Sequence, residues 1–321
     1  MRFIALAAYL PLFPLTAARL PRRQEEGPIE EEPEPEYKAL YDEACNIGFC
    51  SIMGATIGGW GGNYTYVHTL AEFTSAVSGS GAGVIIVNAT ITGIGTPVAI
   101  GSGKSIIGNP GSSLTNVPLN LASSRNIILR NHNLTNSPIT LTGSRSIWLD
   151  HLTLSSPLTI SSASDYISIS NNLFTGSFTA TIDGVHVTIT RNHFQNLKST
   201  VAFRNATAHV FNSFFEKIEA GLDVGAGTDL LLEASVFEDV TRPVYSSGGD
   251  SGAGKATLLN SYLGEGTSEV PAGEMNADSL PYPYDWYVWD MLVTRERVAK
   301  EAGQTLEFEE PLNLPDWDEL E

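Results

Sequence analysis

The segment RNIILRNHNLTNSPITLTGS, residues 125–144, is followed at once by RSIWLDHLTLSSPLTISSAS, residues 145–164, and then by DYISISNNLF, residues 165–174. Aligned end to end, these segments repeat their apolar residues at a step of 20. The step continues with intervals of 20, 20, 20, 21 and 22 through Leu134, Leu154, Phe174, Phe194, Phe215 and Phe237. A second apolar series stands five positions earlier, at Leu129, Leu149, Ile169, Ile189, Val210 and Leu232. Such self-similarity is typical of a solenoid, in which each repeat buries its apolar face against its neighbours.

The apolar residues also alternate within each repeat, as at 127/129, 147/149, 167/169 and 187/189. A period of two is the pattern of a β-strand with one buried face. A repeat of about 20 residues, built from short strands and tight bends, suits stacked rungs at the usual strand spacing of about 4.8 Å. We therefore predict an all-β fold, a single-stranded parallel β-helix, rather than a helical repeat.

The two ends of the chain differ in composition from its middle. An apolar run follows Met1–Arg2 and ends in small residues, which predicts an export signal over residues 1–18. Residues 19–40 form an acidic, Pro-interrupted leader with a dibasic pair, Arg22–Arg23, typical of a processing site, and residues 309–321 form an acidic tail. The remaining residues, 41–308, suffice for one solenoid domain. We expect a secreted, extracellular protein without a membrane anchor.

The formal net charge is −18, from 18 Lys and Arg against 36 Asp and Glu. This charge argues against nucleic acid and anionic membrane surfaces as partners. It also disfavours tight binding of a polyanion, unless metal ions or a local basic patch intervene.

Two further features bear on a secreted chain. Cys45 and Cys50 are the two cysteines, and in an oxidising compartment we expect them to form a local disulfide at the start of the domain. Sequons for N-glycosylation of the form Asn-X-Ser/Thr occur at Asn63, Asn88, Asn133 and Asn205.

Several motifs resemble, in their order along the chain, those of the fungal secreted pectate lyases of the first polysaccharide lyase family. WLDH at Trp148–His151 is similar to the family motif W-[VI]-D-H, and SDYISISNN at Ser164–Asn172 resembles the stretch that follows it. Further similar stretches are GFCS at 48–51, GGWGG at 58–62, HTLAEF at 68–73, KSIIG at 104–108, RPVYS at 242–246 and AGQTL at 302–306. The resemblance implies a right-handed parallel β-helix of the pectin lyase-like kind that acts on pectic polysaccharide.

The family reaction is a β-elimination on polygalacturonate. Bound calcium neutralises the substrate carboxylate, an arginine removes the C5 proton, and the glycosidic oxygen leaves. By this resemblance Asp150 stands at one calcium carboxylate, whereas the other two carboxylate positions hold Ser155 and Thr159. Calcium is therefore the cofactor that the resemblance implies, with Asp150 as its remaining charged ligand.

The basic residues of the family site are also reduced. Ser199 replaces the base arginine, Thr179 replaces the cleft lysine, and Arg204 retains the second arginine. Arg204 and Asp150 are the candidate catalytic residues, although Arg204 can equally form a structural salt bridge. The site is therefore that of a degenerate enzyme or of a pseudoenzyme.

Three further residues, Lys198, His193 and Asp183, are candidates for substrate binding in the same groove. Asp150 and His151 are adjacent, so in a strand their side chains are expected on opposite faces, with Asp150 outward and facing the groove.

Other recurring residues are interpreted as structural. The phenylalanines of the repeat share the core period, so we expect an interior stack rather than a platform for sugars. Asn131, Asn171, Asn192 and Asn212 recur near one bend and are expected to satisfy turn backbone groups. The aromatic segment at 281–289 either packs as a C-terminal arm or covers a groove, where a ring can stack on a sugar. The run from Met291 to Val298 predicts a short closing helix.

Three functions remain open. The first is a secreted pectate-lyase-like protein that acts on pectic polysaccharide by β-elimination. The second is a catalytically inactive descendant that binds a pectic or other glycan. The third is a β-helix scaffold repurposed for a small molecule in secondary metabolism. In each case we expect a monomer.

Overall fold

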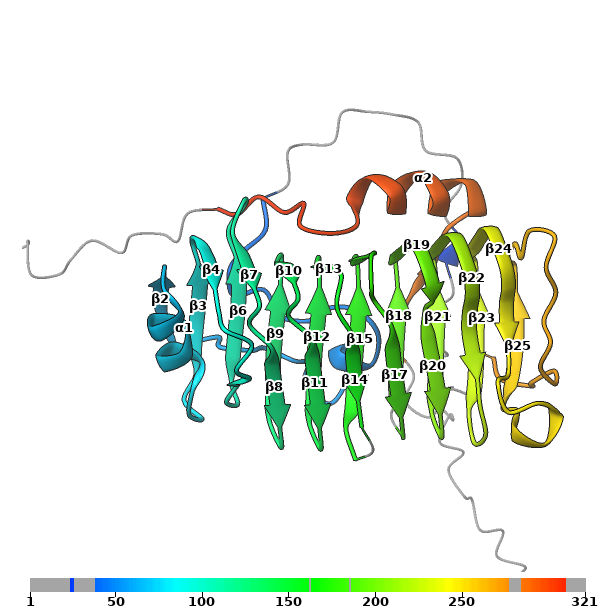
Figure 1. Cartoon of the computed structure of the whole chain (residues 1–321), viewed down its shortest axis with the longest axis horizontal. Coiled ribbons are helices and arrows are strands. Elements are labelled where there is room, and N and C mark those ends of the chain that lie inside the picture. Colours follow the sequence, from blue (N-terminus) through cyan, green and yellow to red (C-terminus); the bar gives the residue numbers. More distant parts are fainter. Residues whose placement is uncertain (1–23, 26–37, 162, 185, 277–283, 310–321) are drawn as a thin grey trace, which may run out of the picture.

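The computed structural model describes residues 24–25, 38–161, 163–184, 186–276 and 284–309. The predicted export signal, nearly all of the predicted leader and the predicted tail beyond residue 309 lie outside these residues. Within them, the repeats form parallel strands that stack along one axis (Figure 1). The predicted parallel β-helix is confirmed.

Each rung contributes one strand to a ten-stranded sheet that runs along the solenoid. The register is constant, so Ile147 lies beside Ile127 on one side and Ile167 on the other. Alternate apolar residues of these strands point into the core. The strands are, in order, β2 (Asn63–Val67), β3 (Gly83–Val87), β6 (Lys104–Gly108), β9 (Arg125–Arg130), β12 (Arg145–Asp150), β15 (Asp165–Ser170), β18 (His186–Thr190), β21 (Thr207–Phe211), β23 (Asp229–Glu233) and β25 (Lys255–Leu259).

A second sheet has 14 strands in two halves. The first half contains β4 (Thr90–Thr92), β7 (Ser113–Thr115), β10 (Asn133–Thr135), β13 (Thr153–Leu154), β16 (Leu173–Phe174) and β19 (His193–Ser199). The second half contains β20 (Val201–Arg204), β17 (Ala180–Asp183), β14 (Leu158–Ile160), β11 (Ile139–Thr142), β8 (Leu119–Ala122) and β5 (Val98–Ala99). The long strands β22 (Phe214–Val224) and β24 (Val236–Tyr245) continue from one half into the other, because β22 pairs with both β19 and β20.

The bend that joins the two sheets has one geometry in seven consecutive rungs. Its first residue has a positive φ, between 41° and 60°, at Asn131, His151, Asn171, Arg191, Asn212, Ala234 and Asn260. Among residues with a side chain, asparagine tolerates this left-handed conformation best. The bend therefore explains why asparagine recurs there.

The second residue of the bend points inward and forms a hydrogen-bonded ladder along the solenoid axis. The backbone N–H of Leu152 donates to Oδ1 of Asn172 at 2.7 Å, and that of Asn172 donates to Oδ1 of Asn192 at 2.9 Å. The four asparagines that were predicted to share one structural role therefore occupy two different positions of the bend. Asn192 belongs to this inner ladder, whereas Asn131, Asn171 and Asn212 occupy the left-handed position one residue earlier.

The predicted phenylalanine stack is confirmed. The rings of Phe174, Phe194, Phe215 and Phe237 follow one another at centroid distances of 4.8, 4.6 and 4.2 Å, and none is more than 1% exposed. Offset or parallel aromatic contacts add to the hydrophobic gain of burial. The stack fills the core of four consecutive rungs, through β16, β19, β22 and β24.

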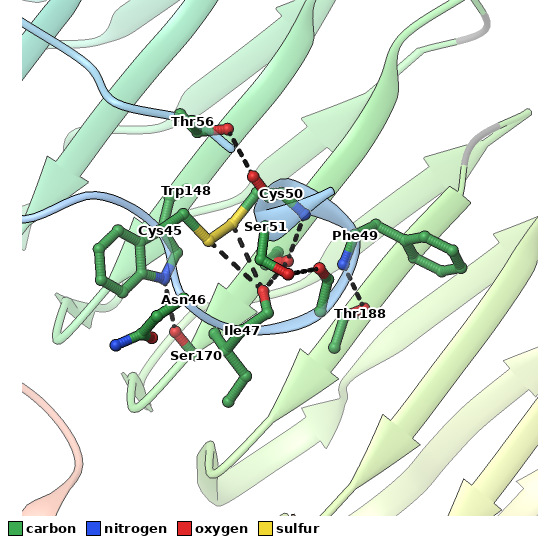
Figure 2. Close-up of a disulfide and its surroundings, with 12 residues drawn as sticks. Cys45, Asn46, Ile47, Phe49, Cys50, Ser51, Thr56, Trp148, Ser170 and Thr188 are labelled. Atoms are coloured by element: carbon green, nitrogen blue, oxygen red, sulfur yellow. Dashed lines mark hydrogen bonds between the residues drawn. A yellow bond between two sulfur atoms is a disulfide. The ribbon is translucent and has the colours of Figure 1, made fainter. Parts of the chain in front are cut away.

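Residues 38–62, the N-terminal segment, cover the outer face of the ten-stranded sheet. Cys45 and Cys50 form the expected disulfide beside the short helix η1 (Gly48–Ser51), as Figure 2 shows. The N–H of Cys50 donates to Ser168 Oγ at 3.0 Å, and that hydroxyl donates to the Ile47 carbonyl at 2.8 Å. Strand β15 therefore holds the disulfide loop by direct hydrogen bonds.

Residues 284–309 form the C-terminal arm, which begins on this outer face and then runs along the bends between the two sheets. Tyr284 and Trp286 are 6% and 2% exposed. The Tyr284 hydroxyl forms hydrogen bonds of 2.8 Å with Thr188 Oγ1 and 2.7 Å with His209 Nδ1. The described part of the aromatic segment thus packs as an arm. Tyr287 is the exception among the described rings of this segment, since it is 43% exposed, so the alternative that a ring stacks on a sugar stays a prediction for this residue. Residues 281–283 lie outside the described part.

Two helices and a small sheet complete the fold. Helix α1 (Leu70–Val77) closes the N-terminal end of the solenoid with Phe73 and Val77 fully buried. Helix α2 (Met291–Glu301) begins at Met291, as predicted, and packs on Phe214 and Val236. Strands β1 (Gln24–Glu25) and β26 (Tyr287–Val288) pair, and η2 spans Asp250–Gly252. In the described part of the chain, no helix has the length and apolar character needed to span a membrane.

One member of the inner ladder predicts a pH dependence of stability. His132 is fully buried, its Nε2–H donates to the Ile106 carbonyl at 3.1 Å, and burial lowers the pKa of His132 to about 4. An unfolded histidine titrates at about 6.5, so between these values the unfolded chain binds more protons than the folded chain. The free energy of unfolding should therefore fall as the pH drops from 6.5 to 4, by up to about 1.4 kcal/mol per pH unit.

His132→Leu provides the test, because Leu152 occupies the same inner position in the next rung. Urea unfolding at several pH values should show a shallower loss of stability in the variant than in the wild type. Equal slopes for the two proteins in this window would contradict the assignment.

Candidate functional site

The outer face of the second half of the 14-stranded sheet carries a row of aligned side chains, termed the central row. Residues alternate in and out along each strand, so in β11 Ile139 and Leu141 are buried and Thr140 points outward. The cross-strand register places in one row Asn120, Thr140, Thr159, Thr181, Ala202, Asp223 and Tyr245. The row is neutral from Asn120 to Ala202 and acquires charge at Asp223.

Arg204 lies at the end of β20, beside the central row, and is held by several acceptors. Its Nη2 donates to Asp223 Oδ2 at 2.8 Å and to Ser247 Oγ at 3.0 Å, and its Nη1 donates to the Phe203 carbonyl at 2.6 Å. Its side chain is 36% exposed. The structural interpretation of Arg204 as a salt-bridge residue is therefore confirmed.

Asp223 accepts hydrogen bonds from Ser247 as well as from Arg204. Ser247 donates its N–H to Oδ1 at 2.9 Å and its hydroxyl to Oδ2 at 2.7 Å. Burial favours protonation of this carboxyl, but the hydrogen bonds from Arg204 and Ser247 outweigh it and hold the pKa of Asp223 below its usual range. Arg204 therefore faces an ionised partner at neutral pH.

The other three residues that were predicted to line the groove lie in different places. Asp183 pairs in register with Arg204, and its Oδ1 accepts from Asn205 Nδ2 at 3.0 Å. Lys198 is exposed near the end of β19, next to Ser199. His193 lies at the other end of β19, where it stacks on Phe214 at 4.9 Å and contacts Glu216 at 3.3 Å.

The expectation that His193 shares the groove with Arg204 is wrong. The long unbroken strand β19 places His193 near helix α2, in the first half of the sheet. Burial lowers the pKa of His193, which favours its neutral form.

Asp150 is fully buried on the outer face of the ten-stranded sheet, under the N-terminal segment. Its Oδ1 accepts from Ser170 Oγ at 2.7 Å and Asn171 Nδ2 at 2.9 Å. Its Oδ2 accepts from Arg130 Nε at 2.9 Å and His151 Nδ1 at 2.8 Å. Despite burial, these contacts keep the pKa of Asp150 well below its usual range.

Two expectations for Asp150 are therefore wrong. It does not face a groove, because the strand that carries it belongs to the other sheet from Arg204. It does contact His151, because the left-handed φ of 49° at His151 turns the imidazole back toward the carboxylate. All of its acceptor positions are used, so Asp150 is a structural residue.

The sequence profile described as pectate lyase matches residues 149–306. Pectate lyase A of Emericella nidulans is 31% identical over 293 residues, which cover 82% of this chain and 87% of that protein. Pectate lyase B of Colletotrichum gloeosporioides is 32% identical over 303 residues, covering 84% and 89%. This chain belongs to the pectate lyase family.

Solved structures agree with the fold. The pectate lyase Bsp165PelA from Bacillus sp. N165, in complex with trigalacturonate, superimposes with a TM-score of 0.66 at 20% identity, covering 81% of this chain and 98% of that one. Pectate lyase C from Erwinia chrysanthemi, studied with Ca²⁺, gives a TM-score of 0.60 at 17% identity, covering 80% and 95%.

The residues present do not fit the calcium site that the pectate lyase family implies. Asp150 is saturated by protein donors, and Ser155 and Thr159 offer hydroxyls where calcium prefers carboxylates. Ser155 Oγ is itself 3.5 Å from the Leu134 carbonyl. Across the described residues, no group of three or more His, Cys, Asp or Glu could hold a metal ion.

Some residues of this site were not predicted from the sequence. Ser247 and Tyr245 complete the surroundings of Arg204 and Asp223, and the threonines extend the row. A signal existed, because Thr140, Thr159 and Thr181 stand about one repeat apart, as do Asp223 and Tyr245. Outward threonine is also favoured in any β-strand, so this spacing alone did not indicate a site.

The structure predicts that Asp150→Ala lowers stability. Arg130 is 4% exposed, and the substitution removes its partner on Nε while Glu43 still contacts Nη1 at 2.7 Å. A buried charge that loses its partner costs about 3 kcal/mol. Urea unfolding should show this loss, whereas Thr181→Ala on the exposed row should change stability by less than about 0.5 kcal/mol. An Asp150→Ala protein as stable as the wild type would contradict the structural role.

Proposed function

We propose that this protein is a secreted, monomeric member of the pectate lyase family that binds pectic polysaccharide of low charge along the central row. In this proposal it does not carry out the calcium-dependent β-elimination of the family. The proposal depends mainly on one observation. The Arg204 guanidinium donates hydrogen bonds to Asp223 and Ser247 and lies beside an otherwise neutral row. Export is supported by the predicted signal over residues 1–18 and by the Cys45–Cys50 disulfide.

The shape of the row suits an extended polymer. Six steps at about 4.8 Å give a length of about 29 Å from Asn120 to Tyr245. Amide and hydroxyl groups at regular spacing can exchange hydrogen bonds with the hydroxyls of several successive sugars. The ring of Tyr245 lies at one end, under the Arg242 guanidinium at 4.2 Å from its centroid.

The charge of the face favours esterified over free galacturonate. Polygalacturonate carries a carboxylate on each sugar, and Asp183 and Asp223 lie on or beside the row. The positive charge of Arg204 is offset by Asp223 at 2.8 Å, so little attraction remains for a polyanion. Methyl esterification removes the carboxylate charge and with it the repulsion.

The groups that β-elimination requires, a base and a cation, are also not available on this face. A general base must lie within reach of the C5 proton and a cation must stabilise the carboxylate. Ser199 stands at the base position, and the Arg204 guanidinium already donates to three acceptors. These contacts support binding without turnover.

Binding and elimination can be measured on the same protein. In affinity electrophoresis with highly methyl-esterified pectin or polygalacturonate, each with calcium or with chelator, we expect retention by methylated pectin that chelator does not change. No unsaturated product should appear by ultraviolet absorbance. Thr181→Glu should weaken binding about tenfold, about 1.4 kcal/mol, by adding a charge within the row.

Thr92→Glu makes the same change on β4, in the other half of the sheet, and should leave binding unaltered. Calcium-dependent release of unsaturated product would show that elimination survives. Equal effects of the two variants would show that the central row is not the binding face.

A further inference from the structure

The four sequons occupy different structural positions, and one of them lies in an unusual setting. Asn63 is exposed at the start of β2, which is the edge strand of the ten-stranded sheet. Thr65, the third residue of the sequon, is exposed on the same face of that strand. Beyond β2 no further strand of the described chain pairs with this edge (Figure 1).

Trp60 stands three residues before Asn63 and is 62% exposed. Two glycines of its turn lie directly on the neighbouring backbone, because a Cβ on Gly59 would come within 1.9 Å of the Gly83 carbonyl and one on Gly62 within 2.4 Å of Ala82. The turn therefore lies flat on the start of β3 and leaves the indole in solvent. A single exposed ring is common on protein surfaces, but this one stands three residues before an exposed sequon and can therefore contact a group attached there.

We propose that Asn63 carries an N-linked glycan whose first sugar packs against the face of Trp60. The Asn63 Nδ2–C1 bond forms as the C1–O bond to a lipid diphosphate-linked oligosaccharide donor breaks. Nδ2 loses one proton, and the lipid diphosphate leaves. The glycan is thus the occupant of the Trp60 surface, and the sequence Trp-Gly-Gly-Asn-Tyr-Thr at 60–65 places ring and sugar within one turn.

Two of the other sequons are poor acceptors in the folded structure. The Asn205 amide nitrogen donates to Asp183 at 3.0 Å, and its backbone has a φ of 51°. Asn133 lies in register between Ser113 and Thr153, and the N–H of Gln304 in the C-terminal arm donates to Thr153 Oγ1 at 3.1 Å. The arm therefore passes beside Asn133 and would collide with a glycan there.

Asn88 is exposed and serves as a comparator. Its Oδ1 accepts from Asn109 at 2.9 Å, which leaves its nitrogen available, but the residue three positions before it is the buried Ile85. A glycan at Asn88 would therefore have no aromatic surface to rest on from its own strand.

A glycan at Asn63 also shields the exposed edge of the ten-stranded sheet. An edge strand presents unpaired N–H and C=O groups on which another chain can pair. Strand β2 carries two further half-exposed aromatic rings, Tyr64 at 41% and Tyr66 at 42%, so its edge is prone to association. A bulky hydrophilic group at the first residue of the strand blocks that pairing.

The first experiment is glycopeptide mass spectrometry of the full chain secreted from yeast. We expect most molecules to carry a glycan at Asn63 and none to carry one at Asn133 or Asn205. Asn63→Gln and Thr65→Ala should each abolish the Asn63 glycan. An unmodified Asn63 in the secreted protein would overturn the proposal.

The second experiment tests contact with Trp60 by a double-mutant cycle. Asn63→Gln should lower Tm by about 2 °C when Trp60 is present and leave Tm unchanged in a Trp60→Ala protein. Trp60→Phe, which keeps an aromatic face, should restore the shift. The same shift in all three backgrounds would show that the glycan does not rest on this ring.

Fluorescence gives an independent measure of the same contact. Trp148, Trp286 and Trp289 are 2–3% exposed, so in a Trp317→Phe background Trp60 dominates quenching by acrylamide. Enzymatic removal of the glycan should increase quenching in this protein and leave a Trp60→Phe version unchanged. Quenching that is unaffected by deglycosylation would overturn the stacking. These outcomes are independent of pectin binding, which uses the other sheet.

Discussion

The structure depends on one constraint, the return of the chain to the same register in every rung of a parallel sheet. Consecutive strands of the ten-stranded sheet pair because each rung brings the chain back alongside the previous one. Seven consecutive bends have a left-handed first residue. Where the inward second residue is polar, as at Asn172, Asn192 and Ser235, its side-chain oxygen accepts a backbone N–H from the preceding rung and so satisfies a backbone group at the turn.

The same regularity creates two faces with different uses. The N-terminal segment and the first part of the C-terminal arm cover the ten-stranded sheet. The outward polar residues of this sheet therefore form buried hydrogen-bond networks. Asp150 with Arg130, and Tyr284 with Thr188 and His209, fasten these segments to the strands. In the described part of the chain, Thr140, Thr159 and Thr181 on the second half of the 14-stranded sheet are partly or fully exposed, and our proposal assigns the ligand to this face.

This member of the pectate lyase family shares the fold of solved pectate lyases, and the resemblance predicts that the polar groups of its site differ. A solenoid tolerates this well, because outward residues contribute little to the core that holds the rungs together. Arg204 persists, but a carboxylate and a hydroxyl from the next rungs occupy its hydrogen-bonding positions. Outward residues of a solenoid can therefore be replaced without disturbing the strands beneath them.

The pattern of apolar residues was enough to predict the architecture. A 20-residue period and alternation of apolar residues admit few folds other than stacked β-rungs, so the phenylalanine stack and the closing helix were predicted correctly. Which of the candidate residues lie together could be seen only in the folded chain. Asp150 and Arg204 both follow strand patterns, yet only the path of the chain shows that they lie on different sheets. His193 and Arg204 are close in sequence, but an unbroken β19 separates them. Periodicity reports which residues point outward, whereas the bends and covering segments decide which outward face meets water.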